Sequence, residues 1–210
     1  MLRPRRFPTL GWQARRSSAR QFEIRASGQS TISNQQSFDR AHDEVRNPNS
    51  AMIHGVQVKP LTVLPDDRGF LMEMLRADEP FFEGFGQVYI TGCRRGVAKA
   101  WHYHRKQTDH FVCVGGTALV ALYDGREDAP TRGLIQEVVL HSPPSQDPVP
   151  LILKIPPLVV HGFTAINSGE ARIINMPTFP YHYADPDEYR YPWNSPDIPY
   201  RWPSEVVRGG

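Results

Sequence analysis

The sequence predicts an all-β domain, an antiparallel sandwich or barrel, preceded by a polar extension. Short apolar stretches recur from residue 52 onward, with turn residues between them. The chain also contains 20 prolines, which suit a fold with many turns better than a bundle of helices. Its 210 residues are enough for one domain with extensions.

The first 51 residues are rich in Arg, Ser, Gln and Asn and lack a sustained apolar period. Such a segment cannot bury enough apolar surface to fold alone, so we expect a disordered extension. Its Arg-rich, Ser-rich start also fits an organellar transit peptide, and a third interpretation places the natural start at Met52. We therefore divide the chain into an extension (1–51), a folded domain (52–203) and a short tail (204–210).

The first predicted strand spans residues 53–64 and ends at a turn, Pro65-Asp66-Asp67-Arg68-Gly69. A second strand follows at 70–75. Residues 77–85 hold at most one or two helical turns, because Gly84 and Gly86 end any helix there. The residues from 179 to 203 are dense in Pro and Tyr and should pack over the domain as extended chain. The remaining predicted strands are 87–93, 98–104, 109–114, 118–123, 135–140, 151–155, 159–166 and 171–176.

Charge and cysteine content exclude several classes of function. Nine of the 24 basic residues but only four of the 22 acidic residues lie in the extension, so the folded domain is mildly acidic. We therefore expect no nucleic-acid partner, and no apolar run approaches the roughly 20 residues that span a bilayer. Cys93 and Cys113 lie in apolar runs and are predicted to be buried thiols, which favours a cytoplasmic location, or an organellar one if the extension is a transit peptide.

Three histidines and one carboxylate form the main candidate site. His102 and His104 are two residues apart, so on a strand both imidazoles point to the same face. Asp109 follows after a short turn, and His161 lies in a later strand. Such a set suits a divalent transition metal, although strand histidines more often bond to a neighbour and the adjacent Arg105-Lys106 disfavours a cation.

The spacing Gly96-x5-His102-x-His104-x4-Asp109-x6-Gly116 resembles the first motif of the cupin superfamily. Pro156 to His161 resembles the second motif. The resemblance implies an antiparallel cupin-type jelly roll. In metal-binding cupins the positions of His102, His104, Asp109 and His161 ligate a divalent metal, although Asp109 stands where Glu is usual.

A narrower resemblance covers residues 52–203. The chain is similar to the dTDP-4-dehydrorhamnose 3,5-epimerase family, which implies a homodimer that shares a strand and a cofactor-free isomerase reaction in carbohydrate biosynthesis. The substrate of that family is a nucleotide-linked 4-keto-6-deoxyhexose. The motifs that carry the resemblance, in order, are Asp67-Arg68-Gly69-Phe70, Glu73, Gln87, His102-Tyr103, Asp124-Gly125-Arg126, Pro130-Thr131, His161-Gly162-Phe163 and Arg201-Trp202-Pro203.

This resemblance implies roles for individual residues. His102 matches the general base, for which a neutral imidazole is suited near neutral pH, and His161 matches a second active-site histidine. The expected substrate contacts are Arg68 with the diphosphate, Glu73 and Gln87 with the nucleotide, Lys99 in place of an Arg, and Asn175.

Four further positions depart from the family pattern. The proton-donating Tyr of the family aligns with Asn175, its active-site Lys with Asp109 and a barrel Asp with Val120, and only Glu205 remains to orient the base. These departures leave a metal-dependent cupin and a non-catalytic sugar-nucleotide-binding module as alternatives. The pair His102 and His104 also resembles the sugar 3,4-ketoisomerase branch of the same fold.

Overall fold

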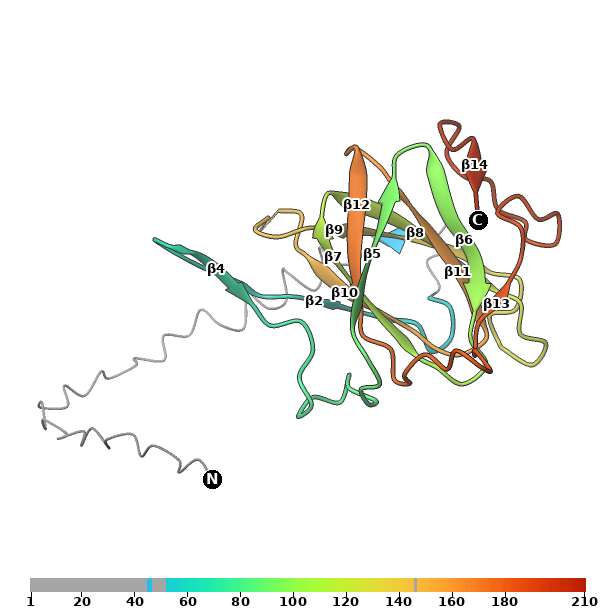
Figure 1. Ribbon diagram of the computed structural model, residues 1–210, viewed down its shortest axis with the longest axis horizontal. Coiled ribbons are helices and arrows are strands. Elements are labelled where there is room, and N and C mark those ends of the chain that lie inside the picture. Colours follow the sequence, from blue (N-terminus) through green and yellow to red (C-terminus); the bar gives the residue numbers. More distant parts are fainter. Residues whose placement is uncertain (1–44, 47–51, 146) are drawn as a thin grey trace, which may run out of the picture.

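Two antiparallel sheets face each other across an apolar core in the computed structural model, which describes residues 45–46, 52–145 and 147–210 (Figure 1). The first sheet has the order β1-β9-β8-β11-β6-β13, and β14 pairs in parallel with β6. The second sheet has the order β2-β10-β7-β12-β5, while β3 and β4 form a separate two-stranded sheet. The strands are β1 (Val45–Arg46), β2 (Gln57–Pro60), β3 (Val63–Asp66), β4 (Gly69–Met72), β5 (Tyr89–Arg94), β6 (Val97–Tyr103), β7 (Asp109–Gly115), β8 (Thr117–Asp124), β9 (Ile135–His141), β10 (Leu151–Ile155), β11 (Val159–Ala165), β12 (Glu170–Asn175), β13 (Tyr189–Arg190) and β14 (Arg208–Gly209).

The predicted all-β architecture and most predicted strands are confirmed. The expected strand at 53–64 instead divides into β2 and β3. The chain follows β10 as far as Leu61, whose N–H donates to the Pro150 carbonyl at 2.8 Å, and then leaves the barrel. Within the described part of the chain, residues 77–81 form turns and 82–85 have no regular structure. No helix among the described residues is long and apolar enough to cross a membrane.

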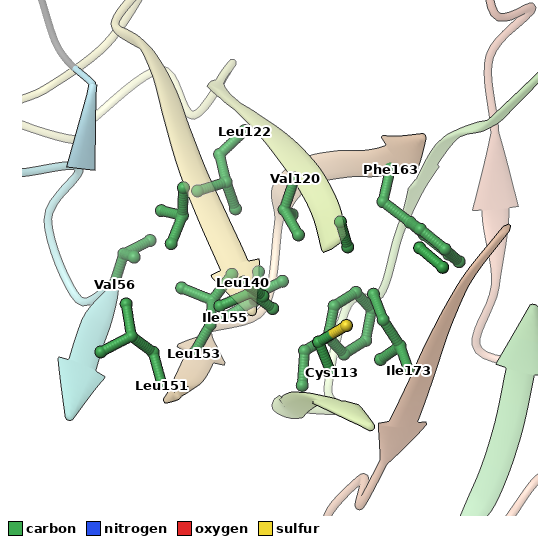
Figure 2. Close-up of a cluster of buried hydrophobic side chains, with 14 of the residues drawn as sticks. Val56, Cys113, Val120, Leu122, Leu140, Leu151, Leu153, Ile155, Phe163 and Ile173 are labelled. Carbon is green, nitrogen blue, oxygen red and sulfur yellow. The ribbon is translucent and has the colours of Figure 1, made fainter. Parts of the chain in front are cut away.

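The main core fills the space between the two sheets (Figure 2). Val120 and Leu122 from β8 meet Leu153 and Ile155 from β10, and all four are at most 1% exposed. Burial of apolar surface contributes about 25 cal/mol per Å², so this layer supplies the main stabilisation of the barrel. Both cysteines are free and buried, as predicted from their apolar runs.

Aromatic residues of the C-terminal segment cover the outer face of the first sheet. Trp101 points away from the barrel interior and packs against Tyr200 and Trp202, with ring centroids 5.5 and 4.9 Å apart. The prediction that this segment packs over the domain is therefore confirmed. The expected tail at 204–210 includes β14, which pairs with Val97 and Ala98 of β6.

The hairpin of β3 and β4 extends away from the barrel (Figure 1). Asp67 and Arg68 form its tip, and Leu64, Phe70 and Leu71 are between 47% and 56% exposed. Its strands pair only with each other within the described residues. The hairpin therefore presents an apolar, self-contained ribbon to solvent.

Of the extension, the structure describes only residues 45 and 46, which form β1. Val45–Arg46 pairs with Val138 and Glu137 of β9 and so adds to the edge of the first sheet. The predictions of disorder or a transit peptide for the other residues of 1–51 lie outside the described residues.

Candidate active site

A β-bulge in β6 brings Lys99 and His102 to the same pocket. The strand alternation alone puts residues three apart on opposite faces. In β6, however, the pairing with β11 shifts between His161↔His102 and Phe163↔Lys99, so two residues of β6 oppose one residue of β11. Lys99 and His102 both line the pocket as a result.

Gly162 makes this bulge possible. A Cβ atom at Gly162 would lie 2.3 Å from the Cβ of Ala100 and 2.8 Å from the Lys99 carbonyl oxygen. Only glycine permits so close an approach of the two strands. The His161-Gly162-Phe163 motif therefore places one histidine and also shapes the strand that carries the other.

The three predicted histidines and Asp109 converge at the base of the pocket. The ligating atoms of the four side chains lie within 4.8 Å of one another. His102 is half-buried and opens to the pocket, while the other three are buried. The ring centroids of His102 and His161 are 4.1 Å apart, and those of His102 and His104 are 5.5 Å apart.

Backbone carbonyls determine which nitrogen of two imidazoles faces the cluster. Nδ1 of His161 lies 3.0 Å from the Val159 carbonyl, and Nδ1 of His104 contacts the Asp187 carbonyl. A carbonyl only accepts hydrogen bonds, so each Nδ1 carries a hydrogen. In the neutral form both Nε2 atoms therefore present lone pairs.

These two Nε2 atoms each lie 3.2 Å from the same oxygen, Oδ2 of Asp109. None of the three atoms has an aligned hydrogen-bond partner among the described residues. Three converging lone pairs repel one another unless protons or a cation lie between them. The cluster therefore fits protons held between the imidazoles and the carboxylate, or a bound metal ion.

The charges in the cluster follow from this geometry. Burial alone would favour a neutral Asp109, but the facing imidazoles of His104 and His161 hold the pKa of that carboxyl well below its usual range. Burial likewise opposes a charge on His104, but the neighbouring Asp109 carboxylate raises the pKa of the imidazole. Burial, and then the neighbouring His161, hold the pKa of His102 well below its usual range. His102 is therefore neutral near pH 7.

Asp187, from the segment that follows β12, holds the turn after β6. The carboxylate of Asp187 accepts hydrogen bonds from the backbone N–H groups of Arg105, Lys106 and Gln107, at 2.9, 2.9 and 3.1 Å. Its own carbonyl accepts from His104. This contact between distant segments orients one of the three histidines.

The pocket above His102 has a volume of about 980 Å³. Tyr89 and Thr91 of β5 line it together with Gln87, which precedes the strand, since alternate residues of an extended chain share a face. Lys99 donates a hydrogen bond to Thr91 at 2.9 Å, which holds a cation in the pocket wall. Phe111 and Phe163 provide apolar surface.

The predicted residue Asn175 lies behind this wall. It is fully buried, and its amide donates to Oη of Tyr89 and to Oδ1 of Asp109, both at 2.9 Å. Asn175 therefore connects the carboxylate of the histidine cluster to a phenol that lines the pocket.

Arg68 and Glu73 are not part of the pocket in their own chain. Arg68 lies at the tip of the projecting hairpin, pairs with Asp66 at 2.6 Å and has a side chain 84% exposed. Glu73 pairs with Arg76 beside a smaller cavity of about 350 Å³. The sequence interpretation placed them with His102 because it could not show that the hairpin leaves the barrel.

Glu205, the only candidate left to orient His102, also lies elsewhere. It is exposed, and its backbone carbonyl packs beside Gly96 at the far end of β6. The carboxylate that does lie among the histidines is Asp109.

The sequence analysis missed several pocket residues. Tyr89 could have been found from the alternation with Gln87, since both lie in the same predicted strand. Glu188 and Arg190 line the pocket beside His102 because Arg190 of β13 pairs with His102. No local signal predicted that pairing, since 88 positions separate the two residues.

Fold and site together define a cupin-type barrel whose pocket ends in a cluster of histidines. The model of the dTDP-4-dehydrorhamnose 3,5-epimerase family matches residues 50–208. The chain therefore belongs to this family and is an enzyme of the sugar-nucleotide epimerase class.

Relatives support the same placement. The chain is 40% identical over 154 residues to the spore coat polysaccharide biosynthesis protein SpsL of Bacillus subtilis, a match that covers 73% of this chain and 99% of SpsL. It is also 40% identical over 156 residues to the probable low-salt glycan biosynthesis epimerase Agl13 of Haloferax volcanii, which covers 73% and 97% of the two chains. Among solved structures, a dTDP sugar isomerase from Desulfovibrio desulfuricans G20 is similar at 34% identity and a TM-score of 0.65, covering 71% of this chain and 92% of that one.

Proposed function

We propose that this enzyme epimerises a nucleoside-diphosphate-linked 4-keto-6-deoxyhexose and that His102 removes the proton next to the ketone. The observation that carries the proposal is that His102 is the one member of the histidine cluster that is both neutral and open to the pocket. A general base must reach the substrate and must be unprotonated. His161 is 1% exposed and packs behind His102, so it acts through His102.

The pocket offers what the enolate and the nucleotide require. Removal of the proton places negative charge on the ketone oxygen, and a fixed cation nearby stabilises it. Lys99 is such a cation, since it lines the pocket and is held by Thr91. The volume of about 980 Å³ is at the upper end of ligand pockets and suits a substrate as large as a nucleotide sugar.

A homodimer would explain the projecting hairpin. An exposed apolar ribbon such as this one marks a docking surface. A second copy of the chain fits it, because Arg68 and Glu73 of one subunit would then be carried toward the pocket of the other. Their predicted contacts with the diphosphate and the nucleotide depend on this arrangement.

Exchange of solvent deuterium tests the proposed reaction. In heavy water, a dTDP-linked 4-keto-6-deoxyhexose should gain deuterium at C3 or C5, as followed by NMR. His102→Ala should abolish the exchange, while His54→Ala, which removes an exposed histidine outside the pocket, should leave it unchanged. Saturable binding of the sugar nucleotide by the wild-type protein without any exchange would contradict the proposal and favour a non-catalytic binding module.

A bound metal is the second candidate function, and the three converging lone pairs favour it. His102, His104, His161 and Asp109 are the donor types that hold divalent transition metals. Such an ion would supply a Lewis acid at the base of the pocket. His102 would then be a ligand rather than a base.

Metal analysis distinguishes the two candidates. The metal-site candidate predicts about one ion per chain in protein purified without chelators, and d–d absorption bands after loading with Co²⁺. Asp109→Asn should lower the metal content, and exposed Asp128→Asn should not. Substoichiometric metal after reconstitution, without Co²⁺ bands, would rule out this candidate and leave His102 free to act as a base.

A further inference from the structure

Inversion of a carbon next to a ketone requires two groups. One group removes the proton from one face, and another delivers a proton to the opposite face. If His102 is the base, as the proposed function requires, then a proton donor must approach from the other side of the pocket. His102 lies on β6 of the first sheet, and the second sheet forms the facing side of the barrel.

Tyr89 is the phenol of the second sheet that lines this pocket. It belongs to β5 of the second sheet, and its side chain lines the same pocket as His102. Two other phenols line the pocket, Tyr181 and Tyr183, but these lie in the segment after β12 and pack edge to face on each other at 5.1 Å. Of these three phenols, Tyr89 is the one that a strand positions.

The polarity of the hydrogen bonds around Tyr89 leaves its proton available. Oδ1 of Asn175 accepts from the backbone N–H of His110 at 3.1 Å, which identifies the other amide atom as the nitrogen. That nitrogen donates one hydrogen to Asp109 and one to Oη of Tyr89, both at 2.9 Å. The phenol oxygen is therefore an acceptor in this bond, and its own hydrogen can point to a ligand in the pocket.

We propose that Tyr89 is the general acid of the epimerisation and delivers its phenolic proton to the face of the sugar opposite His102. In the first step His102 takes the proton, and the C–H electron pair forms the enolate. In the second step the enolate carbon uses that pair to form a new C–H bond with the Tyr89 proton, and the O–H pair stays on the phenolate. Solvent then protonates the phenolate and removes the proton from His102.

Two features of the surroundings suit this role. Burial, and then the nearby Asp109 carboxylate, raise the pKa of Tyr89 to about 12, so the phenol keeps its proton at neutral pH. The N–H of Asn175 stabilises the phenolate that forms, since a hydrogen bond to a charged group is stronger than one to a neutral group.

Tyr89→Phe separates proton removal from inversion. With a dTDP-linked 4-keto-6-deoxyhexose in heavy water, this variant should form the epimer at least about 100-fold more slowly than wild type. It should still exchange deuterium with retention of configuration, because His102 can return a deuteron to the face from which it removed the proton. Tyr123→Phe, which removes a phenol outside the pocket, is the matched control.

Each outcome of this experiment is informative. Epimer formation within about threefold of wild type would overturn the assignment of Tyr89. Loss of both exchange and inversion, with unchanged affinity for dTDP by calorimetry, would also overturn it, since an acid on the far face is not needed for proton removal. Failure of the proposed function looks different, because wild type itself would then neither exchange nor epimerise. The affinity for dTDP also shows that the variant is folded.

Discussion

His102 and His161 lie directly opposite each other on the antiparallel strands β6 and β11, with ring centroids 4.1 Å apart. The rings meet at 61°, and each comes from a motif on a different part of the chain. This pairing keeps a half-buried imidazole that opens to the pocket against a fully buried one. It therefore links the basicity of His102 to the identity of residue 161.

The pairing predicts the pH dependence of the enzyme. As a base His102 works unprotonated, so activity falls as the pH drops through its pKa, which lies well below its ordinary value of about 6.5. We expect kcat/KM to stay constant from pH 8 to 6.5. In His161→Asn the acid limb should move to higher pH, because His161 helps to lower the pKa of His102. A profile of kcat/KM between pH 5 and 8 measures both effects. An acid limb at the same pH in His161→Asn and wild type would show that His161 does not lower the pKa of His102.

Gly162→Ala should disturb the bulge that brings Lys99 and His102 together. The new methyl group would lie 2.3 Å from the Cβ of Ala100, so the strands must separate. Overpacking of this kind costs about 1–3 kcal/mol of unfolding free energy. We also expect kcat/KM to fall, measured beside Gly169→Ala, where a Cβ meets no atom within 4 Å. Equal stability and activity of the two variants would show that the bulge tolerates a side chain.

The projecting hairpin should carry the contact between subunits. Replacing Phe70 and Leu71 with serine removes apolar side chains that are 47% and 56% exposed. Sedimentation should show a dimer for wild type and a monomer for the double variant, with the thermal midpoint of the barrel little changed. Val207→Ser removes an apolar residue elsewhere that is even more exposed, at 75%, and this variant should remain dimeric. A wild-type monomer at micromolar concentration would refute the dimer.

The buried Asp124 should stabilise the fold in a pH-dependent way. Its carboxylate accepts from Nε of Arg126 at 2.7 Å, from Nη2 at 2.8 Å and from Thr131 at 2.6 Å. Breaking a buried pair of this kind costs about 3 kcal/mol, so Asp124→Asn should lower the unfolding free energy by that amount at pH 7.

The same network predicts how this cost varies with pH. Burial opposes the charge, but the bonds from Arg126 and Thr131 lower the pKa of Asp124. The stabilisation is thus present above the unfolded value of about 3.9 and is lost as the pH falls through the folded value. Denaturant unfolding at pH 7 and pH 3 should show the difference between wild type and variant shrinking. Asp128→Asn, at an exposed position, should have little effect at either pH. If Asp124→Asn lowered the unfolding free energy equally at pH 7 and pH 3, the ionised Asp124 carboxylate would not be the source of the stabilisation.

Local pattern was enough to predict the barrel and the centre of the site. Alternation along a strand places His102 and His104 on one face, and the spacing of the two motifs indicated that Asp109 and His161 belong to the same site, where the structure brings all four together. The short apolar runs also located β5 to β12 to within two residues at each end. These features depend on neighbours in the chain, which is why they can be predicted from it.

The rest of the site depends on contacts between distant segments. Strand alternation by itself would separate Lys99 from His102, and only the bulge against Gly162 brings both into the pocket. Tyr89 received no role until the structure placed it against Asn175 across β5 and β12. Arg68 was assigned to a pocket that its own hairpin does not reach.

The sequence alone determined the all-β barrel, the epimerase-like motifs and the grouping of the histidines. The period of a strand and the spacing of a motif are local properties, so they can be read from the order of residues. Tertiary structure alone decided which groups face the substrate pocket and which nitrogen of each imidazole points inward. It also decided which proton donor stands across from the base. Those properties arise from strand register, from one bulge and from hydrogen bonds between residues far apart in the chain, and no local pattern encodes them.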